Sequence, residues 1–174
     1  MNLKNIVLII SVFLLFSAVS LAATHSLTID TRGSLIGTYS TEYEQALAPN
    51  VSLGIQGQIT NLKEDDTELK AFGLAAGRRQ YIGEQSFSGP YWGAYGTLNW
   101  MNISQPQKSS CLSLGIAGSG GFKLIIADGM VLDVGLSMGT PLFSRIEVPG
   151  DNKDETVAFG AIGFGLTVGM GYAW

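Results

Sequence analysis

The sequence predicts an all-β protein, an eight-stranded antiparallel up-and-down transmembrane β-barrel. Three observations predict this fold. Large apolar residues alternate with small or polar ones along most of the chain, which is the period of a β-strand. Glycine is abundant, with 23 residues, whereas charged residues make up only 14% of the chain. Aromatic residues gather near the ends of the alternating stretches, on their apolar face.

Length and charge narrow the class further. The chain has 174 residues, which suits one domain. Its 10 Lys and Arg residues are scattered and outnumbered by 14 Asp and Glu residues, so no basic stripe is available for phosphates and no nucleic acid is expected as a partner. The single cysteine, Cys111, allows neither an internal disulfide nor a cysteine-based zinc site. We expect neither a cofactor nor a metal.

Residues 1–22 have the pattern of a secretory signal peptide. Lys4 supplies the positive start, and an apolar run follows over 6–16. Ser20 and Ala22 place small residues at positions −3 and −1 of a cleavage site. The apolar run is about half as long as the roughly 20 residues that a membrane-spanning helix needs. A mature domain over 23–174 is therefore expected, after secretion across the inner membrane.

Seven strands are predicted from the alternation. The C-terminal stretch is the clearest, because its even-numbered residues from Ile162 to Trp174 are all large and apolar while the odd-numbered ones are small. Such a pattern is too rich in glycine for a helix. The predicted strands, in chain order, cover residues 35–47, 51–61, 68–81, 90–102, 110–123, 130–140 and 157–174.

The connections between these strands predict an eighth. Short turns at 48–50 and 126–129 face longer or more polar connections such as 141–156, so seven strands would leave the two ends of the domain on opposite sides. A bacterial outer-membrane barrel has an even number of strands and both termini in the periplasm. The alternating residues 26–31 therefore predict a further strand that turns at Arg32-Gly33-Ser34; one long bent strand over 26–47 is the alternative.

The direction in which the apolar face points decides the kind of barrel. A soluble barrel turns it inward, whereas a membrane barrel turns it toward lipid and fills its interior with small and polar groups. We expect the charged residues of the opposite face to form an ionic network inside the barrel. These residues are Asp30, Glu42, Glu44, Arg79, Lys123 and Asp133.

Aromatic residues of the apolar face are expected to form girdles at the two membrane interfaces. These residues are Tyr43, Phe72, Trp92, Trp100, Phe122, Tyr172 and Trp174. Eight residues separate Trp92 from Trp100, and with a rise of about 3.3 Å and a tilt of about 35–45° they span roughly 20 Å along the barrel axis. This span is close to the ~25 Å apolar band of such barrels.

The chain ends in Gly171-Tyr172-Ala173-Trp174, which resembles the C-terminal signal that the barrel-assembly machinery of bacterial outer membranes recognises. Tyr172 and Trp174 carry this resemblance, although a terminal phenylalanine is commoner than tryptophan. With the signal peptide, residues 27–174 resemble the small eight-stranded barrels typified by outer membrane proteins A and X. The stretch from Glu42 through Pro49 to Gly54 is similar to an uncharacterised family of such barrels, whose members carry no assigned activity.

No catalytic site is expected. Paired carboxylates such as Glu42 and Glu44 can do acid–base chemistry, but an ion-pair network with Arg79 is the interpretation we favour. Small outer-membrane enzymes, lipid A deacylases and palmitoyltransferases, use a histidine with a serine and an acidic residue. The one histidine, His25, lies at the start of the mature domain, so a His-dependent triad on the barrel wall is not expected.

We expect an outer-membrane protein with a structural or surface-interaction role and no open pore, because side chains fill the interior of an eight-stranded barrel. Its expected partners are outer-membrane lipid and, during biogenesis, the barrel-assembly machinery. The 141–156 connection is the candidate contact with an unknown extracellular partner, through Phe143, Arg145, Ile146 and Val148; alternatively, these residues only extend a hairpin above the membrane. A second class of function is a soluble periplasmic or secreted barrel that binds an apolar ligand, which needs inverted faces.

Overall fold

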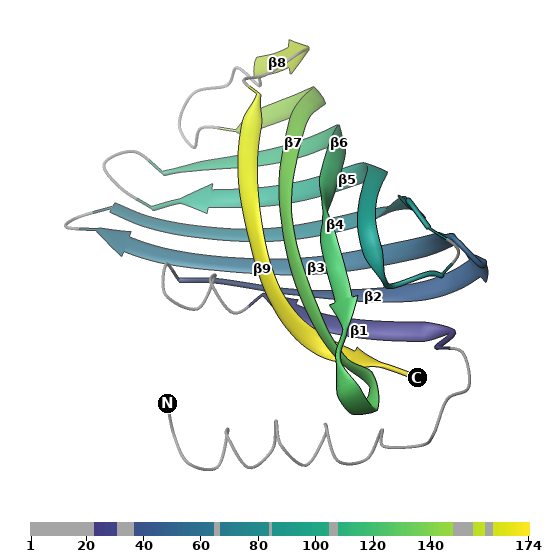
Figure 1. The fold of residues 1–174 in the computed structure, drawn as a ribbon. Helices are drawn as coiled ribbons and strands as arrows, with labels where there is room; N and C mark the ends of the chain where they lie inside the picture. The colour runs from purple at the N-terminus through teal and green to yellow at the C-terminus, as the bar shows by residue number, and fades with distance from the viewer. Residues whose placement is uncertain are drawn as a thin grey trace.

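The computed structural model describes residues 23–30, 37–64, 67–83, 85–104, 108–147, 155–158 and 162–174 (Figure 1). Within these residues the chain forms almost only β-strands. The strands are β1 (His25–Asp30), β2 (Thr38–Ala48), β3 (Val51–Glu64), β4 (Thr67–Tyr81), β5 (Gly89–Ile103), β6 (Ser109–Ile125), β7 (Met130–Glu147), β8 (Glu155–Ala158) and β9 (Gly163–Ala173). No helix in the described part is long and apolar enough to cross a membrane.

Eight of these strands close into a ring. Strands β1 to β7 each pair antiparallel with the next strand in sequence, and β9 pairs with both β7 and β1. Strand β8 pairs with the end of β7 that extends past this ring, where Figure 1 shows it standing clear of the barrel. The predicted fold class, an eight-stranded antiparallel up-and-down barrel, is confirmed.

The N-terminal part of the domain forms two strands. β1 and β2 run antiparallel, with Leu27 opposite Tyr43 and Ile29 opposite Thr41. A single bent strand over 26–47 is therefore wrong. The predicted turn at 32–34 and the predicted signal peptide at 1–22 lie outside the described residues.

The two ends of the barrel differ in their connections. One end, called the turn end, carries the β2–β3, β4–β5 and β6–β7 connections. The two ends of the described chain also lie side by side there, because the backbone amides of Thr24 and His25 both donate to the carbonyl of Trp174. At the other end, called the loop end, β3 to β7 run further than predicted. β3 continues to Glu64 before β4 starts at Thr67.

The largest difference from the sequence prediction is in β7, which was expected to stop at residue 140. It continues to Glu147, because its backbone pairs with β6 as far as Ser110 and with β8 on its other edge. The register shifts between Leu114 and Gly115 of β6, where Leu142 is the extra residue of a β-bulge. The bulge breaks the period-two pattern, so periodicity ended the predicted strand too early.

The alternation in sequence becomes the two faces of the wall. Large apolar side chains point outward; Leu136 is 67% exposed and Phe164 is 80% exposed. Many hydroxyl side chains point inward, as do the charged side chains of Glu42, Glu44, Arg79, Lys123 and Asp133. The buried hydrophobic cluster is small and lies at the turn end, where it consists of Tyr81, Phe87, Tyr91, Val131 and Ala173.

Candidate functional site

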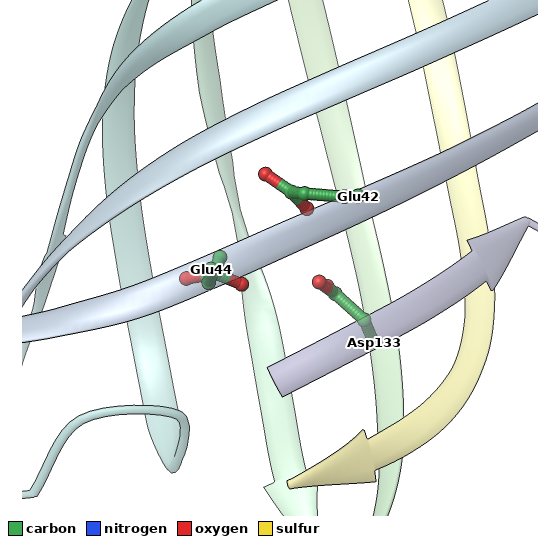
Figure 2. A group of neighbouring side chains, drawn as sticks. All are labelled: Glu42, Glu44 and Asp133. Atoms are coloured by element: carbon green, nitrogen blue, oxygen red, sulfur yellow. The ribbon is translucent and has the colours of Figure 1, made fainter. Parts of the chain in front are cut away.

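Five charged side chains from four strands meet inside the barrel, in the half next to the turn end. Glu42 and Glu44 project from β2, Arg79 from β4, Lys123 from β6 and Asp133 from β7. Each is at most 8% exposed. Figure 2 shows the three carboxylates pointing toward one another across the interior. We call these five residues the ionic cluster.

Arg79 is the centre of the ionic cluster. Its Nη1 donates to Glu44 Oε1 at 2.7 Å and to Asp133 Oδ2 at 3.1 Å. Its Nη2 donates to both carboxylate oxygens of Glu42, at 3.0 and 2.8 Å, and its Nε donates to the hydroxyl of Tyr95 at 3.1 Å. The guanidinium carbon lies 4.0 Å from the ring centre of Tyr91. One guanidinium therefore links β2, β5 and β7 to β4.

Lys123 on β6 contacts two of the same carboxylates, those of Glu44 and Asp133. Its ammonium forms an ion pair with Glu44 and lies 3.6 Å from Asp133 Oδ2. It also donates to the hydroxyls of Ser26 at 3.2 Å and Thr28 at 3.5 Å on β1. Because no part of the Lys123 side chain is exposed, its charge is balanced by protein groups and not by water.

Hydroxyl groups also donate to the carboxylates of the ionic cluster. Ser52 and Tyr81 both donate to Glu44 Oε2, at 2.6 and 2.8 Å. Tyr91 donates to Asp133 Oδ1 at 2.7 Å, and Tyr95 donates to Glu42 Oε1 at 3.2 Å. Every carboxylate oxygen of the ionic cluster thus accepts at least one hydrogen bond, which is what a buried charged network needs in order to be stable.

Phe87 closes the barrel beneath the ionic cluster. It belongs to the β4–β5 connection, yet its side chain is fully buried, and its ring packs edge-on against Tyr81 with centroids 6.1 Å apart. Its backbone is left-handed, with φ 65°, a conformation that a bulky residue adopts only when the surroundings hold it there. Ser86 donates to the carbonyls of Ala48 and Pro49, both at 2.9 Å, and so ties this connection to the β2–β3 turn.

Glycines opposite Tyr91 make room for its ring. A Cβ atom at Gly121 would lie 2.6 Å from the Tyr91 hydroxyl oxygen, and one at Gly135 would lie 2.5 Å from it. Both distances are too short for a real side chain. Tyr91 can therefore reach across to Asp133 only because β6 and β7 carry glycine at these inward positions.

The three carboxylates could in principle hold a metal ion, since one oxygen from each lies within 4.8 Å of the others. Arg79 and Lys123 already supply positive charge at that point. The ion pairs with Arg79 and Lys123 also engage Glu42 and Glu44, the carboxylates that acid–base chemistry would use. The arrangement is therefore that of a satisfied structural network.

Asp30 takes a different place from the rest of the predicted network. It lines a cavity of about 110 Å³ beside the ionic cluster, together with Glu42, Arg79 and Asp133. The buried Ser119 Oγ on the wall of this cavity has no hydrogen-bond partner in the described part of the chain. Asp30 also lines the larger cavity that follows toward the loop end.

The half of the interior next to the loop end is neutral and open. Its cavity has a volume of about 480 Å³, and apart from Asp30 its polar lining carries amides and hydroxyls. The polar side chains that line it are Thr38, Ser40, Gln56, Gln58, Thr97, Asn99, Ser113, Ser137, Thr140 and Thr167. Hydroxyls and amides can be satisfied by water, so this half needs no fixed partners.

Most aromatic residues predicted to form girdles are exposed on the outside of the wall. Exposed fractions from 36% to 57% are found for Tyr43, Phe72, Trp92, Trp100 and Phe122. Phe72 and Trp100 lie directly opposite each other in the ladder.

The other two predicted girdle residues lie in an aromatic stack at the turn end. Tyr172 stacks on Trp174 at 6.4 Å, Trp174 stacks on His25 at 5.6 Å, and His25 Nδ1 lies 2.7 Å from the Tyr43 hydroxyl. This stack joins β9 to β1 and β2, where the ring closes.

Three residues of the predicted contact loop are instead part of β7. Phe143 and Arg145 are exposed on the same face, whereas Ile146 lies on the opposite face, in register with Cys111. Arg145 Nε lies 3.3 Å from Glu147 Oε1. Val148 lies outside the described residues.

Several residues of the site were missed in the sequence. Phe87 stands in a polar turn, and nothing in the alternation places it inside the barrel. Tyr81 and Tyr91 occupy inward-facing positions of the alternation, at the ends of β4 and β5. A large aromatic residue on a face of otherwise small residues could have predicted their place in the site.

Comparison with known proteins bears on the fold. The sequence matches no family model and no curated protein. Among solved structures, the chain is similar to the crystal structure of Neisserial surface protein A, with a TM-score of 0.58 and 14% sequence identity. The match covers 86% of this chain and 94% of that one. The chain therefore has the fold of the small eight-stranded outer-membrane β-barrels.

Proposed function

We propose that this protein is a small outer-membrane barrel with a structural or surface-interaction role, without an open pore and without catalytic activity. One observation carries the proposal, namely that the usual distribution of side chains is inverted. Glu44, Lys123 and Asp133 are at most 1% exposed, while Leu136 and Phe164 are among the most exposed side chains. In water this distribution is unfavourable, because soluble proteins rarely leave a large continuous apolar surface exposed.

A membrane removes this conflict. Lipid covers the apolar outer wall, and the interior satisfies its own charges. The similarity to a Neisserial surface protein supports the same environment. A soluble barrel with an apolar ligand inside would need the opposite faces, and the ionic cluster occupies the space where such a ligand would bind.

The packing of the turn end supports a closed barrel. Tyr81, Phe87 and Tyr91 are at most 5% exposed, and they fill the interior next to the ionic cluster. In barrels of this class short turns face the periplasm and longer loops face outside. The turn end would then be periplasmic. Tyr172 and Trp174 would be read by the barrel-assembly machinery after a signal peptide at 1–22 has directed secretion.

Fractionation and electrophoresis test the proposal. We expect recovery in the outer membrane and a shift in mobility between heated and unheated samples.

Two neighbouring residues of β7 give a matched pair of variants. Leu136→Lys, on the outer wall, should reduce recovery of folded protein, since a charge at mid-membrane costs about 2–4 kcal/mol. Ser137→Lys, which faces the open cavity, should be tolerated. Recovery as a soluble protein, or the reverse order of the two variants, would refute the proposal.

The part of β7 beyond the ring, with β8, is the segment we propose for an extracellular contact. Phe143 and Arg145 point outward there. An epitope tag inserted after Pro149 should be detected by antibody on intact cells. The same tag inserted after Asp128, in the β6–β7 turn, should require permeabilised cells. Equal detection of both tags on intact cells would contradict this orientation.

A further inference from the structure

Arg78 is an exposed cation on the apolar outer wall. It continues the outward row of β4 that contains Phe72 and Leu74. Its neighbours across the two ladders are Leu53 on β3 and Ala94 on β5. Neither neighbour carries a charge.

Two other outward cations of the strands form ion pairs with carboxylates. At the loop end Lys70 Nζ lies 2.8 Å from Glu68, and Arg145 Nε lies 3.3 Å from Glu147. Arg78 instead donates from Nη2 to the neutral Gln80 Oε1 at 3.2 Å. Within the described residues no carboxylate forms an ion pair with Arg78. The exposed guanidinium is therefore open to an anion from outside the chain.

The side chain of Arg78 is directed toward the turn end. β4 runs from the loop end to the turn end, and Gln80, which accepts the hydrogen bond, lies two residues nearer that end. Gln80 is opposite Trp92, which is 57% exposed. Long cationic side chains lie along apolar surface and extend their charge to the membrane interface. The guanidinium thus points toward the membrane interface at the turn end, where Trp92 lies.

We propose that Arg78, positioned by Gln80, binds the phosphate of a phospholipid in the leaflet at the turn end. This inference rests on the proposed membrane location. A guanidinium offers a planar fork of donors that matches a phosphate group, and in the described part of the chain the Nε and Nη1 groups of Arg78 have no hydrogen-bond partner, which leaves them available for two such bonds. The neighbouring Leu53 and Ala94 provide an apolar surface for the acyl chains.

Native mass spectrometry of the purified barrel in a nonionic detergent, titrated with phosphatidylglycerol, tests the proposal. Loss of a charge-assisted phosphate contact should weaken binding about tenfold in Arg78→Gln, a change of about 1.4 kcal/mol. Lys70→Gln is the control, an exposed cation on the same outer face of β4 that has a carboxylate partner, and it should bind as the wild type does. Gln80→Ala should give an intermediate loss, because Arg78 keeps its charge but not its direction.

A second measurement uses the wild type alone. Diacylglycerol with the same acyl chains but no phosphate should bind far more weakly than phosphatidylglycerol, and inorganic phosphate in excess should not displace the lipid. Equal binding of the two lipids, displacement by inorganic phosphate, or unchanged binding in Arg78→Gln would each overturn the site.

The two proposals fail in different ways. A barrel that shows the heat-dependent mobility shift but no preference for phosphatidylglycerol refutes only the lipid site. A protein recovered in the soluble fraction refutes the membrane location itself.

Discussion

The two halves of the barrel interior share one wall but are filled in different ways. Next to the turn end, the ionic cluster and the rings of Tyr81, Phe87 and Tyr91 fill the space. Next to the loop end, side chains that are neutral apart from Asp30 surround a cavity of about 480 Å³. The first half is held by fixed partners, whereas the second leaves its polar groups to water.

This difference indicates where the barrel obtains its stability. In the charged half, removal of one partner leaves a buried charge without compensation, which is costly. In the neutral half, water can replace a lost hydrogen bond at little cost. We therefore expect variants of the turn-end half to be strongly destabilising and variants of the loop-end half to be nearly neutral.

The largest effect is expected from Arg79→Leu. Three buried carboxylates lose their common donor, and the free energy of unfolding should fall by about 3–5 kcal/mol. Urea unfolding in detergent micelles, followed by tryptophan fluorescence, measures the change. Arg78→Leu, one residue earlier and exposed, is the control and should differ little from the wild type. Equal stability of the two variants would refute the central role of the ionic cluster.

Phe87→Ala should be nearly as severe. The ring is fully buried, and truncation of a buried phenylalanine typically costs about 3–5 kcal/mol; we expect the lower end because Phe87 lies at the edge of the barrel. Thermal unfolding, monitored as the temperature at which the electrophoretic shift is lost, reports the effect. Phe122→Ala removes the same side chain from the outer wall, where it is 45% exposed, and should cost clearly less. A reversed order would show that Phe87 does not close the barrel.

Gly135→Ala is expected to have an intermediate effect. The added methyl group would collide with the Tyr91 hydroxyl and disturb its 2.7 Å hydrogen bond to Asp133, at a cost of about 1–3 kcal/mol. Gly57→Ala adds the same methyl group where no atom lies within 4 Å. The same urea titration applied to both variants should show a loss only for the first. If Gly135→Ala keeps its full stability, Tyr91 has more freedom than its packing indicates.

The smallest effect is expected in the neutral half. Gln58→Leu exchanges a side chain of the loop-end cavity, and stability should stay within about 0.5 kcal/mol of the wild type. Among the residues that the structure describes, its one hydrogen bond to another side chain, from Nε2 to Thr60 Oγ1, is long at 3.4 Å. A loss of several kcal/mol here would show that the two halves do not differ in the way described.

Local pattern was enough to predict the architecture of the wall. The parity of a strand depends only on neighbouring residues, so it placed Glu42, Glu44 and Arg79 on one face and Tyr43, Trp92 and Phe122 on the other. Counting the connections predicted the eighth strand, β1, although its span is only six residues. Parity failed at Pro141 and Leu142, because the bulge there shifts the phase while the ladder continues.

Ring closure and packing decided what the sequence could not. Arg79 meets Asp133, 54 residues away, and Lys123 meets Glu44, 79 residues away, only because the stagger of the closed barrel brings these levels together. Parity fixes the face of a residue but not its height along the axis relative to another strand. Phe87 is the extreme case, since a turn has no parity and the burial of its ring depends entirely on the space that the surrounding strands leave.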